Sequence, residues 1–142
     1  MSIENAKKPI VFNTIHRSRF SDLDPYGHMN TLHYISYFID HRFTECRQKL
    51  QLDLKAMSEL PIIFVNSGIQ VKFRKPIFGD EEFSITSKIT EVTEKNCVVD
   101  LEMKKTNGDI ASTCRLDIIC LDKKNQRPTP WPAEFIERFF EV

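Results

Sequence analysis

The sequence lacks an excess of charge of either sign, because 20 basic and 20 acidic residues give a formal net charge of zero. A chain without a basic surplus has no global field to draw it to nucleic acid or to an anionic membrane. Any phosphate that it binds must instead meet a local cluster of cations. We therefore expect neither a nucleic-acid partner nor a membrane partner.

Long apolar runs are also missing. No stretch approaches the roughly 20 apolar residues of a membrane-spanning helix. The N-terminal segment MSIENAKKPI carries charges where a secretory signal needs an apolar core. A hydrophobic content of 41%, with charges spread along the chain, is not typical of disorder. The sequence predicts a cytoplasmic protein in which residues 1–142 form a single globular domain.

Recognisable metal-binding spacing is a third absence. The four cysteines contain no CxxC pair, and with the four histidines they form no zinc motif. His28, His33 and His41 are not spaced four residues apart, which disfavours a helical metal site. We expect no metal and no cofactor. Free cysteines are usually buried, so reduced core thiols are predicted at Cys46, Cys97, Cys114 and Cys120.

A long helix is the clearest element that the sequence does contain. Apolar residues recur at steps of three and four over residues 30–50 and form one face, made of Met29, Leu32, Ile35, Ile39, Phe43, Cys46 and Leu50. Asn30 is a candidate N-cap, because its side-chain oxygen can accept a hydrogen bond from an N–H of the first turn. Substrate binding is the alternative role for Asn30.

Strands are predicted where the period of apolar positions changes to two. Four such segments follow the helix, at 69–73, 83–89, 97–103 and 110–120, and the segment IVFNTIHRSRF precedes it. Asn107-Gly108 is the residue pair that a type I′ hairpin turn prefers. This order predicts an α+β fold with a five-stranded, mainly antiparallel sheet. A short C-terminal helix is expected in AEFIERFF, directly after Pro132.

The predicted helix and sheet also bear on assembly. A helix of about 20 residues is about 30 Å long and needs a broad apolar cover, which a curved sheet provides. The edges of such a sheet expose unpaired backbone groups, and pairing two copies edge to edge protects them. We expect a homodimer or a dimer of dimers.

The stretch FSDLDPYGHMNTLHY, residues 20–34, gathers polar residues between the first predicted strand and the helix. Loops held between rigid elements often carry binding and catalytic groups, so this stretch is the candidate site. From the residues alone, Asp24 is also a typical turn residue. Asp-Pro commonly begins a turn, and an aspartate can accept a hydrogen bond from its own backbone.

Two segments carry a resemblance to a known family: RSRFSDLDPYGHMNTLHYISYFIDHRFTECRQ and VKFRKPIFGDEEFSITSKI. They resemble the hotdog-fold acyl thioesterases of the 4-hydroxybenzoyl-CoA thioesterase type, which include bacterial long-chain acyl-CoA thioesterases. The resemblance implies a curved sheet wrapped around a central helix, with active sites at the interface between two subunits. It also implies hydrolysis of an acyl-CoA thioester to a free acid and a thiol, with Asp24 as nucleophile or general base.

The chemistry of this position is consistent with that role. A carboxylate beside the start of a helix can attack a carbonyl carbon or activate water, while unsatisfied helix N–H groups polarise the carbonyl oxygen. The oxyanion donors are expected in the main chain around Asn30 and Thr31, with Gly27 allowing close approach of the backbone. Asp22 is the alternative carboxylate, but it matches the family motif less well and is expected to be structural.

His28 is a second candidate catalytic residue. Its imidazole can act as acid or base near neutral pH or can position the thioester, and a packing or capping role is the alternative. The plant acyl-carrier-protein thioesterases, which the loop also resembles, use aspartate, asparagine and histidine at alternating positions. Here Tyr26 replaces the asparagine, so that constellation is not intact.

Substrate contacts can be predicted only by residue type. Aromatic residues between helix and sheet are candidates for lining the acyl pocket, although they are also common in cores: Tyr34, Tyr37, Phe38 and Phe64. Basic residues are candidates for contacts with CoA phosphates, with a solvated strand face as the alternative: Arg74, Lys75, Lys104 and Lys105. An acyl-carrier protein would use similar cations. Glu45 is expected to pair with a basic residue such as Arg42 or Arg74.

Two other functions remain open. A hotdog module can bind an acyl thioester, or only assemble, without turnover, because a shared fold does not ensure shared chemistry. A dehydratase acting on acyl thioesters is the second alternative. The loop from Asp24 to Thr31 matches the thioesterase motif more closely and favours the hydrolase.

Overall fold

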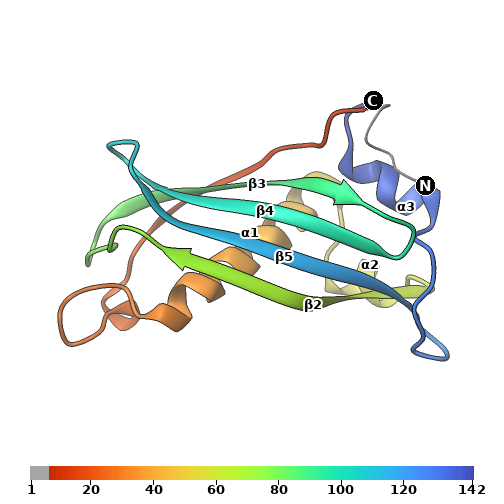
Figure 1. The fold of residues 1–142 in the computed structure, drawn as a ribbon, viewed down its shortest axis with the longest axis horizontal. Helices are drawn as coiled ribbons and strands as arrows, with labels where there is room; N and C mark the ends of the chain where they lie inside the picture. Colours follow the sequence, from red (N-terminus) through yellow and green to blue (C-terminus); the bar gives the residue numbers. More distant parts are fainter. Residues whose placement is uncertain (1–6) are drawn as a thin grey trace.

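A computed structural model describes residues 7–142, and the prediction about a secretory signal lies largely outside them. Strand β1 is followed by the long helix α1 and the short helix α2, then by β2, β3, β4, β5 and the short helix α3 (Figure 1). Their bounds are Phe12–Arg17 (β1), Thr31–Leu50 (α1), Leu54–Ser58 (α2), Ile62–Phe73 (β2), Glu82–Val92 (β3), Asn96–Lys105 (β4), Ile110–Asp122 (β5) and Ala133–Ile136 (α3). Single 3-10 turns lie at Phe20–Asp22 and Glu137–Phe139. The predicted order is confirmed, and α2 is an addition to it.

The five strands form one antiparallel sheet in the order β1-β3-β4-β5-β2, and α1 crosses one of its faces (Figure 1). β2 and β1 are therefore the edge strands. The loop before α1 and the connection from β2 to β3 lie at one end of the molecule, whereas α3 and the C-terminus lie at the other (Figure 1). This separation places the candidate site at the end of the sheet that is distant from α3.

One predicted turn is wrong in its type. A type I′ turn needs positive φ at both central residues, but only Gly108, at 93°, has it, and Asn107 does not. The Gly108 N–H donates to the carbonyl oxygen of Lys105 at 3.0 Å, and the Lys105 N–H donates to Asp109. This is the three-residue hairpin with a left-handed glycine at its end. The Asn-Gly pair marks the hairpin correctly, and the glycine alone supplies the unusual conformation.

The buried face of α1 differs from the predicted one. Its fully buried residues include Tyr34, Phe38, His41 and Glu45, which follow one another at steps of four and three. Leu32 is 71% exposed, and the rest of the predicted stripe in the first four turns is only partly buried: Ile35, Ile39 and Phe43. Periodicity cannot distinguish these two neighbouring stripes when the buried one contains polar residues. An apolar flank of α1 is thereby left incompletely covered.

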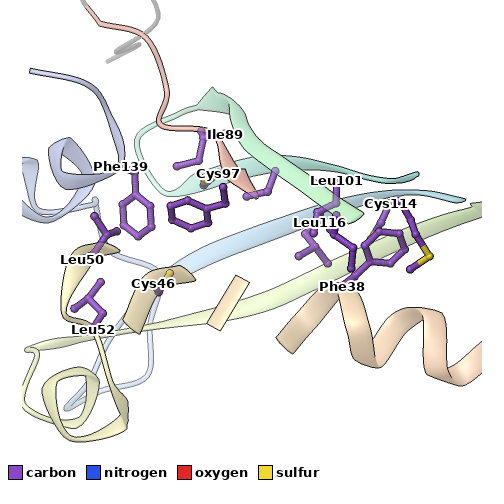
Figure 2. Close-up of a cluster of buried hydrophobic side chains, with 14 of the residues drawn as sticks. Phe38, Cys46, Leu50, Leu52, Ile89, Cys97, Leu101, Cys114, Leu116 and Phe139 are labelled. Atoms are coloured by element: carbon purple, nitrogen blue, oxygen red, sulfur yellow. The ribbon is translucent and has the colours of Figure 1, made fainter. Parts of the chain in front are cut away.

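The core fills the space between α1 and the sheet (Figure 2). Phe38 from α1 is buried there with residues of β4 and β5 such as Leu101 and Leu116. All four cysteines are free and buried, as predicted. Burial raises the pKa of the Cys97 thiol to about 12, so it stays protonated near neutral pH. The predicted C-terminal helix is confirmed, with Pro132 at its N-cap position. None of the helices in residues 7–142 is long and apolar enough to span a membrane.

Glu45 pairs with a basic residue, as predicted, but the partner is Lys49 rather than Arg42 or Arg74. Its carboxylate is buried and accepts a hydrogen bond from the Asn13 N–H of β1 at 2.7 Å, and it lies 3.3 Å from Lys49. Lys49 is one helical turn further along α1, so the pair shares the helix face that packs on β1. The sequence suggested a surface ion pair, whereas the contact joins the helix to an edge strand.

His41 is fully buried within a chain of polar side chains. Its Nδ1 lies 2.7 Å from the Thr14 hydroxyl and its Nε2 lies 2.7 Å from the Ser87 hydroxyl. Burial, followed by the nearby positive charge of Arg42, lowers the pKa of His41 to about 3. The imidazole is therefore neutral in the folded protein and ties β1 and β3 to the helix.

We expect the stability of the protein to fall by about 2 kcal/mol between pH 7 and pH 5 through His41 alone. The unfolded chain takes up a proton near pH 6.5, whereas the folded chain does so only near pH 3. This stability is therefore complete above pH 6.5 and is lost as the pH falls towards 3. Urea unfolding at pH 7, 6 and 5 measures it. His41→Leu should flatten the slope, and an unchanged slope would contradict the assignment.

Candidate active site

The loop before α1 is built around a tight turn at Asp24. The Gly27 N–H donates to the Asp24 carbonyl oxygen at 3.1 Å, and the Asp24 N–H donates to that of His28 at 2.7 Å. Gly27 has a φ of 79°, and a Cβ there would meet nothing within 4 Å. Its role within the chain is therefore conformational, since L-residues with side chains rarely adopt this region. That it also allows a substrate to approach the backbone closely stays a prediction.

The side chain of Asp24 is held by the same turn. Its Oδ1 accepts hydrogen bonds from the N–H groups of Tyr26 at 2.8 Å and His28 at 3.1 Å. Within residues 7–142, Oδ2 has no hydrogen-bond partner. The turn role that aspartate typically plays is thus real, and it occupies one carboxylate oxygen. It also orients the second oxygen, which stays available for chemistry.

A second segment, residues 76–81, holds this loop in place through hydrogen bonds and packing. The Met29 N–H donates to the Ile77 carbonyl oxygen at 2.7 Å, and the Ile77 N–H donates to the Tyr34 hydroxyl at 3.0 Å. A Cβ on Gly79 would lie 2.8 Å from Leu23, so glycine permits this close approach. The segment PIFGD, which lies in the second stretch that carries the family resemblance, therefore supports the candidate site.

Asp22 is fully buried beneath the loop and binds several donors. Its carboxylate lies 2.5 Å from the Tyr37 hydroxyl, 2.8 Å from the Arg19 N–H and 3.0 Å from Nδ1 of His33. Burial alone would raise the pKa of Asp22, but the hydrogen bonds from Tyr37 and Arg19 outweigh it and lower that pKa. Burial and the contact with Asp22 raise the pKa of Tyr37 to about 12. These contacts support the expectation that Asp22 is structural.

The start of α1 supplies candidate hydrogen-bond donors. Asn30 is the N-cap, as predicted, because its side-chain oxygen accepts from the Leu32 N–H at 3.0 Å. The Asn30 N–H is itself used, since it donates to the Asp22 carbonyl oxygen at 2.7 Å. Among the described residues, no acceptor is found for the N–H of Thr31, the first residue of the helix. Thr31 is therefore a better oxyanion-donor candidate than Asn30.

A hollow of about 270 Å³ joins these groups to the end of β2. It is lined by the predicted residues Asp24, His28, Thr31, Tyr34, Arg74 and Lys75, together with Met29, Phe73 and Pro76. Arg74 and Lys75 are exposed, and neither lies within 4.0 Å of a carboxylate in the described part of the chain. The structure thus brings a partly exposed carboxylate, the first N–H of a helix and two cations to one hollow.

His28 lies at the rim of this arrangement. Its ring packs edge-on against Phe78 with the centroids 5.0 Å apart, and its backbone forms a β-bridge with the same residue. No hydrogen bond to the imidazole is found within residues 7–142. The packing alternative considered for His28 is therefore present in the structure, and its edge still lines the hollow.

The four aromatic residues proposed to line an acyl pocket do not lie together. Tyr34 lines the hollow at Asp24, and its ring packs edge-on against Phe73 at 5.1 Å. Tyr37 binds Asp22 instead, and Phe38 is fully buried in the core. Phe64 lines a different hollow, near α3. Aromatic residue type alone therefore did not identify the residues that share a pocket.

The other two predicted phosphate contacts are engaged elsewhere. Lys104 pairs with Glu102 at 3.2 Å, and Lys105 pairs with Glu81 at 3.1 Å. The Lys105 ammonium group also donates to the carbonyl oxygen of Pro76 at 2.9 Å. Neither lysine lines the hollow at Asp24.

Sequence reasoning did not assign Met29, Phe73 and Pro76 to the site. Phe73 was assigned only to the alternating pattern of a strand, yet it is 49% exposed and forms a wall of the hollow. The signal that could have identified it is its position directly before the two cations at the end of a strand. Only the antiparallel pairing of β2 with β5 brings that strand end beside the loop.

Comparison with known proteins identifies the family to which the chain belongs. Residues 18–139 match the thioesterase-like superfamily, and this range includes the whole candidate site. Because the match spans most of the chain, the chain belongs to this superfamily. Membership supports a thioester hydrolase.

The individual relatives have low sequence identity to this chain, but the similarity extends over most of the length of both proteins. The chain is 20% identical to the long-chain acyl-CoA thioesterase FadM of Escherichia coli over 121 residues, which are 84% of this chain and 90% of FadM. A Staphylococcus aureus protein solved in complex with CoA is 19% identical with a TM-score of 0.83, covering 94% of this chain and 84% of that one. The DHNA-CoA thioesterase from Staphylococcus aureus is 20% identical with a TM-score of 0.79, covering 91% and 88%. These likenesses confirm the hotdog fold.

Proposed function

We propose that the protein hydrolyses acyl-CoA thioesters and that Asp24 is its catalytic carboxylate. The observation that carries this proposal is the hollow shared by Asp24, the Thr31 N–H and the cations Arg74 and Lys75, of which the last three have no acceptor or carboxylate partner within residues 7–142. The superfamily match and the acyl-CoA thioesterases among the similar proteins support the same chemistry. The loop motif favours the 4-hydroxybenzoyl-CoA thioesterase type within that superfamily.

The proposed reaction uses the groups already described. The thioester carbonyl oxygen accepts a hydrogen bond from the Thr31 N–H, which stabilises the charge that develops on that oxygen. Asp24 Oδ2 takes a proton from water as the water oxygen bonds to the carbonyl carbon. The carbon–sulfur bond then breaks, and the thiolate receives the proton. Direct attack by Asp24, followed by hydrolysis of the anhydride, is the alternative route. Neither route uses a metal or a redox cofactor.

His28 is proposed to orient the thioester from the rim of the hollow. Its ring packs edge-on against Phe78, which holds it at this position. Tyr34 and Phe73 supply the apolar surface for the first atoms of the acyl group. Gly27 contributes by setting the turn that orients Asp24.

Free-thiol release from short-chain, long-chain and aromatic acyl-CoA substrates tests the proposal. Release by the wild type that is lost in Asp24→Asn at unchanged folding would support it. If the folded wild type released no thiol from acyl-CoA or acyl-carrier-protein substrates, the hydrolase would be contradicted. The non-catalytic hotdog module would then become the leading account, and product analysis for hydration or dehydration would test the dehydratase.

Arg74 and Lys75 are proposed to bind the phosphates of the CoA carrier. We expect the Arg74→Ala/Lys75→Ala double variant to raise KM for an acyl-CoA about tenfold with little change in kcat, because exposed charge pairs contribute up to about 1 kcal/mol each. KM for the matching acyl-pantetheine thioester, which lacks the phosphates, should stay constant. Lys104→Ala is the matched control because Lys104 is already paired. An equal rise in KM for both substrates would contradict phosphate recognition.

We also propose that two copies pair through the edge strand β2. This strand presents exposed apolar side chains, namely Val65, Ile69 and Phe73 at 39%, 46% and 49% exposure, and Phe73 packs against Tyr34 of α1. Its end forms a wall of the hollow at Asp24, so a second copy would complete the site. Light scattering should give at least twice the 16.6 kDa chain mass. A monomer at assay concentration would contradict the dimer without affecting the assignment of Asp24.

A further inference from the structure

A second hollow, of about 180 Å³, lies between α1, the sheet and α3. Its walls are largely apolar and include Phe64 of β2, Leu116 of β5 and Phe135 of α3. Phe139, Cys97 and Ile89, which also line it, lie together at the α3 end of the core (Figure 2). None of the residues that line the hollow at Asp24 takes part. The two hollows are therefore distinct.

Arg42 places a cation in the wall of this apolar space. One guanidinium nitrogen donates to the Ser87 hydroxyl at 3.0 Å, and the group lies 4.4 Å from the centre of the Phe12 ring. No carboxylate of residues 7–142 lies within 4.0 Å of it. Burial lowers the pKa of Arg42 from its usual value, but a guanidinium keeps its charge near neutral pH. A cation in an apolar pocket is most stable with an anion beside it.

Trp131 supplies a second polar group without a partner. Its indole Nε1 is buried, and within the described residues it is the one buried side-chain nitrogen or oxygen that makes no hydrogen bond. Its ring stacks on Phe135 with the centroids 6.0 Å apart, and both residues line the hollow. Buried donors normally have an acceptor, because an unmade hydrogen bond costs about 1–3 kcal/mol. A ligand with acceptor oxygens would provide one.

We propose that this hollow binds a small apolar carboxylate whose body is about the size of one aromatic ring. A cavity of about 150 Å³ is large enough to hold benzene, so the volume fits such a body. The carboxylate would pair with the Arg42 guanidinium, which presents a planar set of donors. The aromatic walls would cover the apolar body, and the Trp131 N–H would find an acceptor. The neutral, apolar surroundings leave Arg42 as the group that selects an acid over an uncharged ligand.

This site does not depend on the proposed hydrolysis. Arg42 is 11 residues beyond Thr31 on α1, which corresponds to about 16 Å along the helix. Loss of turnover in an Asp24 variant would leave ligand binding at Arg42 intact. Conversely, a chain that does not bind the acid can still hydrolyse a thioester. The proposal of acid binding and the proposal of thioester hydrolysis can therefore be tested, and contradicted, independently of each other.

The fluorescence of Trp131 provides a direct readout, because it is the only tryptophan in the chain. We expect titration with sodium benzoate, at constant ionic strength, to change the fluorescence with saturation and to raise Tm. Benzyl alcohol has a similar shape without the charge and should bind at least tenfold more weakly. Hexanoate tests whether an aliphatic body is also accepted, and saturable binding of either acid in preference to the alcohol supports the proposal.

Two variants test whether Arg42 is the residue that makes the hollow prefer an acid over an alcohol. Arg42→Gln should weaken benzoate binding at least tenfold while leaving the affinity for benzyl alcohol unchanged, whereas Arg47→Gln, on the exposed side of the same helix, should change neither. The comparison of acid with alcohol on the wild type keeps the test valid if Arg42→Gln does not fold. The proposal would be overturned if the wild type bound neither acid, if it bound alcohol as tightly as acid, or if folded Arg42→Gln kept the wild-type affinity for benzoate.

Discussion

Replacing Asp24 by asparagine is expected to lower kcat for thioester hydrolysis by about 10²- to 10⁴-fold, the range typical of a lost general base. The amide cannot take a proton from water or attack the carbonyl carbon. Its oxygen can still accept the hydrogen bonds from the N–H groups of Tyr26 and His28 that hold the turn. The fold and Tm should therefore stay close to those of the wild type. This combination separates the chemical role of Asp24 from its role in the turn.

Thiol release with a good acyl-CoA substrate, together with thermal unfolding, measures both parts of the expectation. Asp80→Asn is a suitable control, because Asp80 lies at the same end of the molecule in an exposed, left-handed conformation that asparagine tolerates. It should leave kcat and Tm unchanged. A folded Asp24→Asn protein with wild-type kcat would remove Asp24 from the mechanism.

Replacing Asp22 by alanine is expected to destabilise the protein by about 3 kcal/mol, equivalent to a fall in Tm of about 10 °C. The substitution removes a fully buried acceptor and leaves the Tyr37 hydroxyl and the Arg19 N–H without a partner. The ion pair with the largely exposed Arg19 side chain adds little, because water screens it. The contacts of Asp22 join the loop to the helix, so their loss should also loosen the site.

Urea unfolding and calorimetry of Asp22→Ala give the free energy of unfolding and the Tm. Tyr37→Phe is the matched partner: it removes one of the same hydrogen bonds and should cost about 1 kcal/mol. Because the pKa of Asp22 is lowered in the folded protein, its contribution is present above the usual aspartate pKa and is lost as the pH falls below it. Full loss of activity at unchanged Tm would contradict the structural role and move the chemistry to Asp22.

Several features of this protein could be predicted from local patterns. The helix from Thr31 to Leu50, its Asn30 cap and the order of the five strands follow from sequence patterns and capping chemistry, which depend on neighbours in the chain. The glycine of the Asn107-Gly108 pair is the same kind of signal, although only one residue of that pair has positive φ. Such features need no knowledge of the tertiary structure.

The buried face of α1 could not be predicted in this way. The polar residues His41 and Glu45 lie inside because partners on β1 and β3 satisfy them, namely Thr14, Ser87 and the Asn13 N–H. Hydropathy assigns such side chains to the surface, since their burial depends on partners that are remote in sequence. Arg42 is a similar case, because its position beside an apolar hollow follows from the arrangement of α1 against the sheet.

The sequence by itself determined the order of elements, the loop that carries Asp24 and the family that this loop resembles, because each of these resides in a contiguous stretch of residues. Only the tertiary structure decided which cations share the hollow with Asp24 and that Asp22, rather than Asp24, is the buried aspartate of the loop. It also separated Tyr34 from Phe64, which line two different hollows. The physical reason is that strand pairing and packing bring together groups far apart in the chain, and burial then decides which of them can react with a ligand.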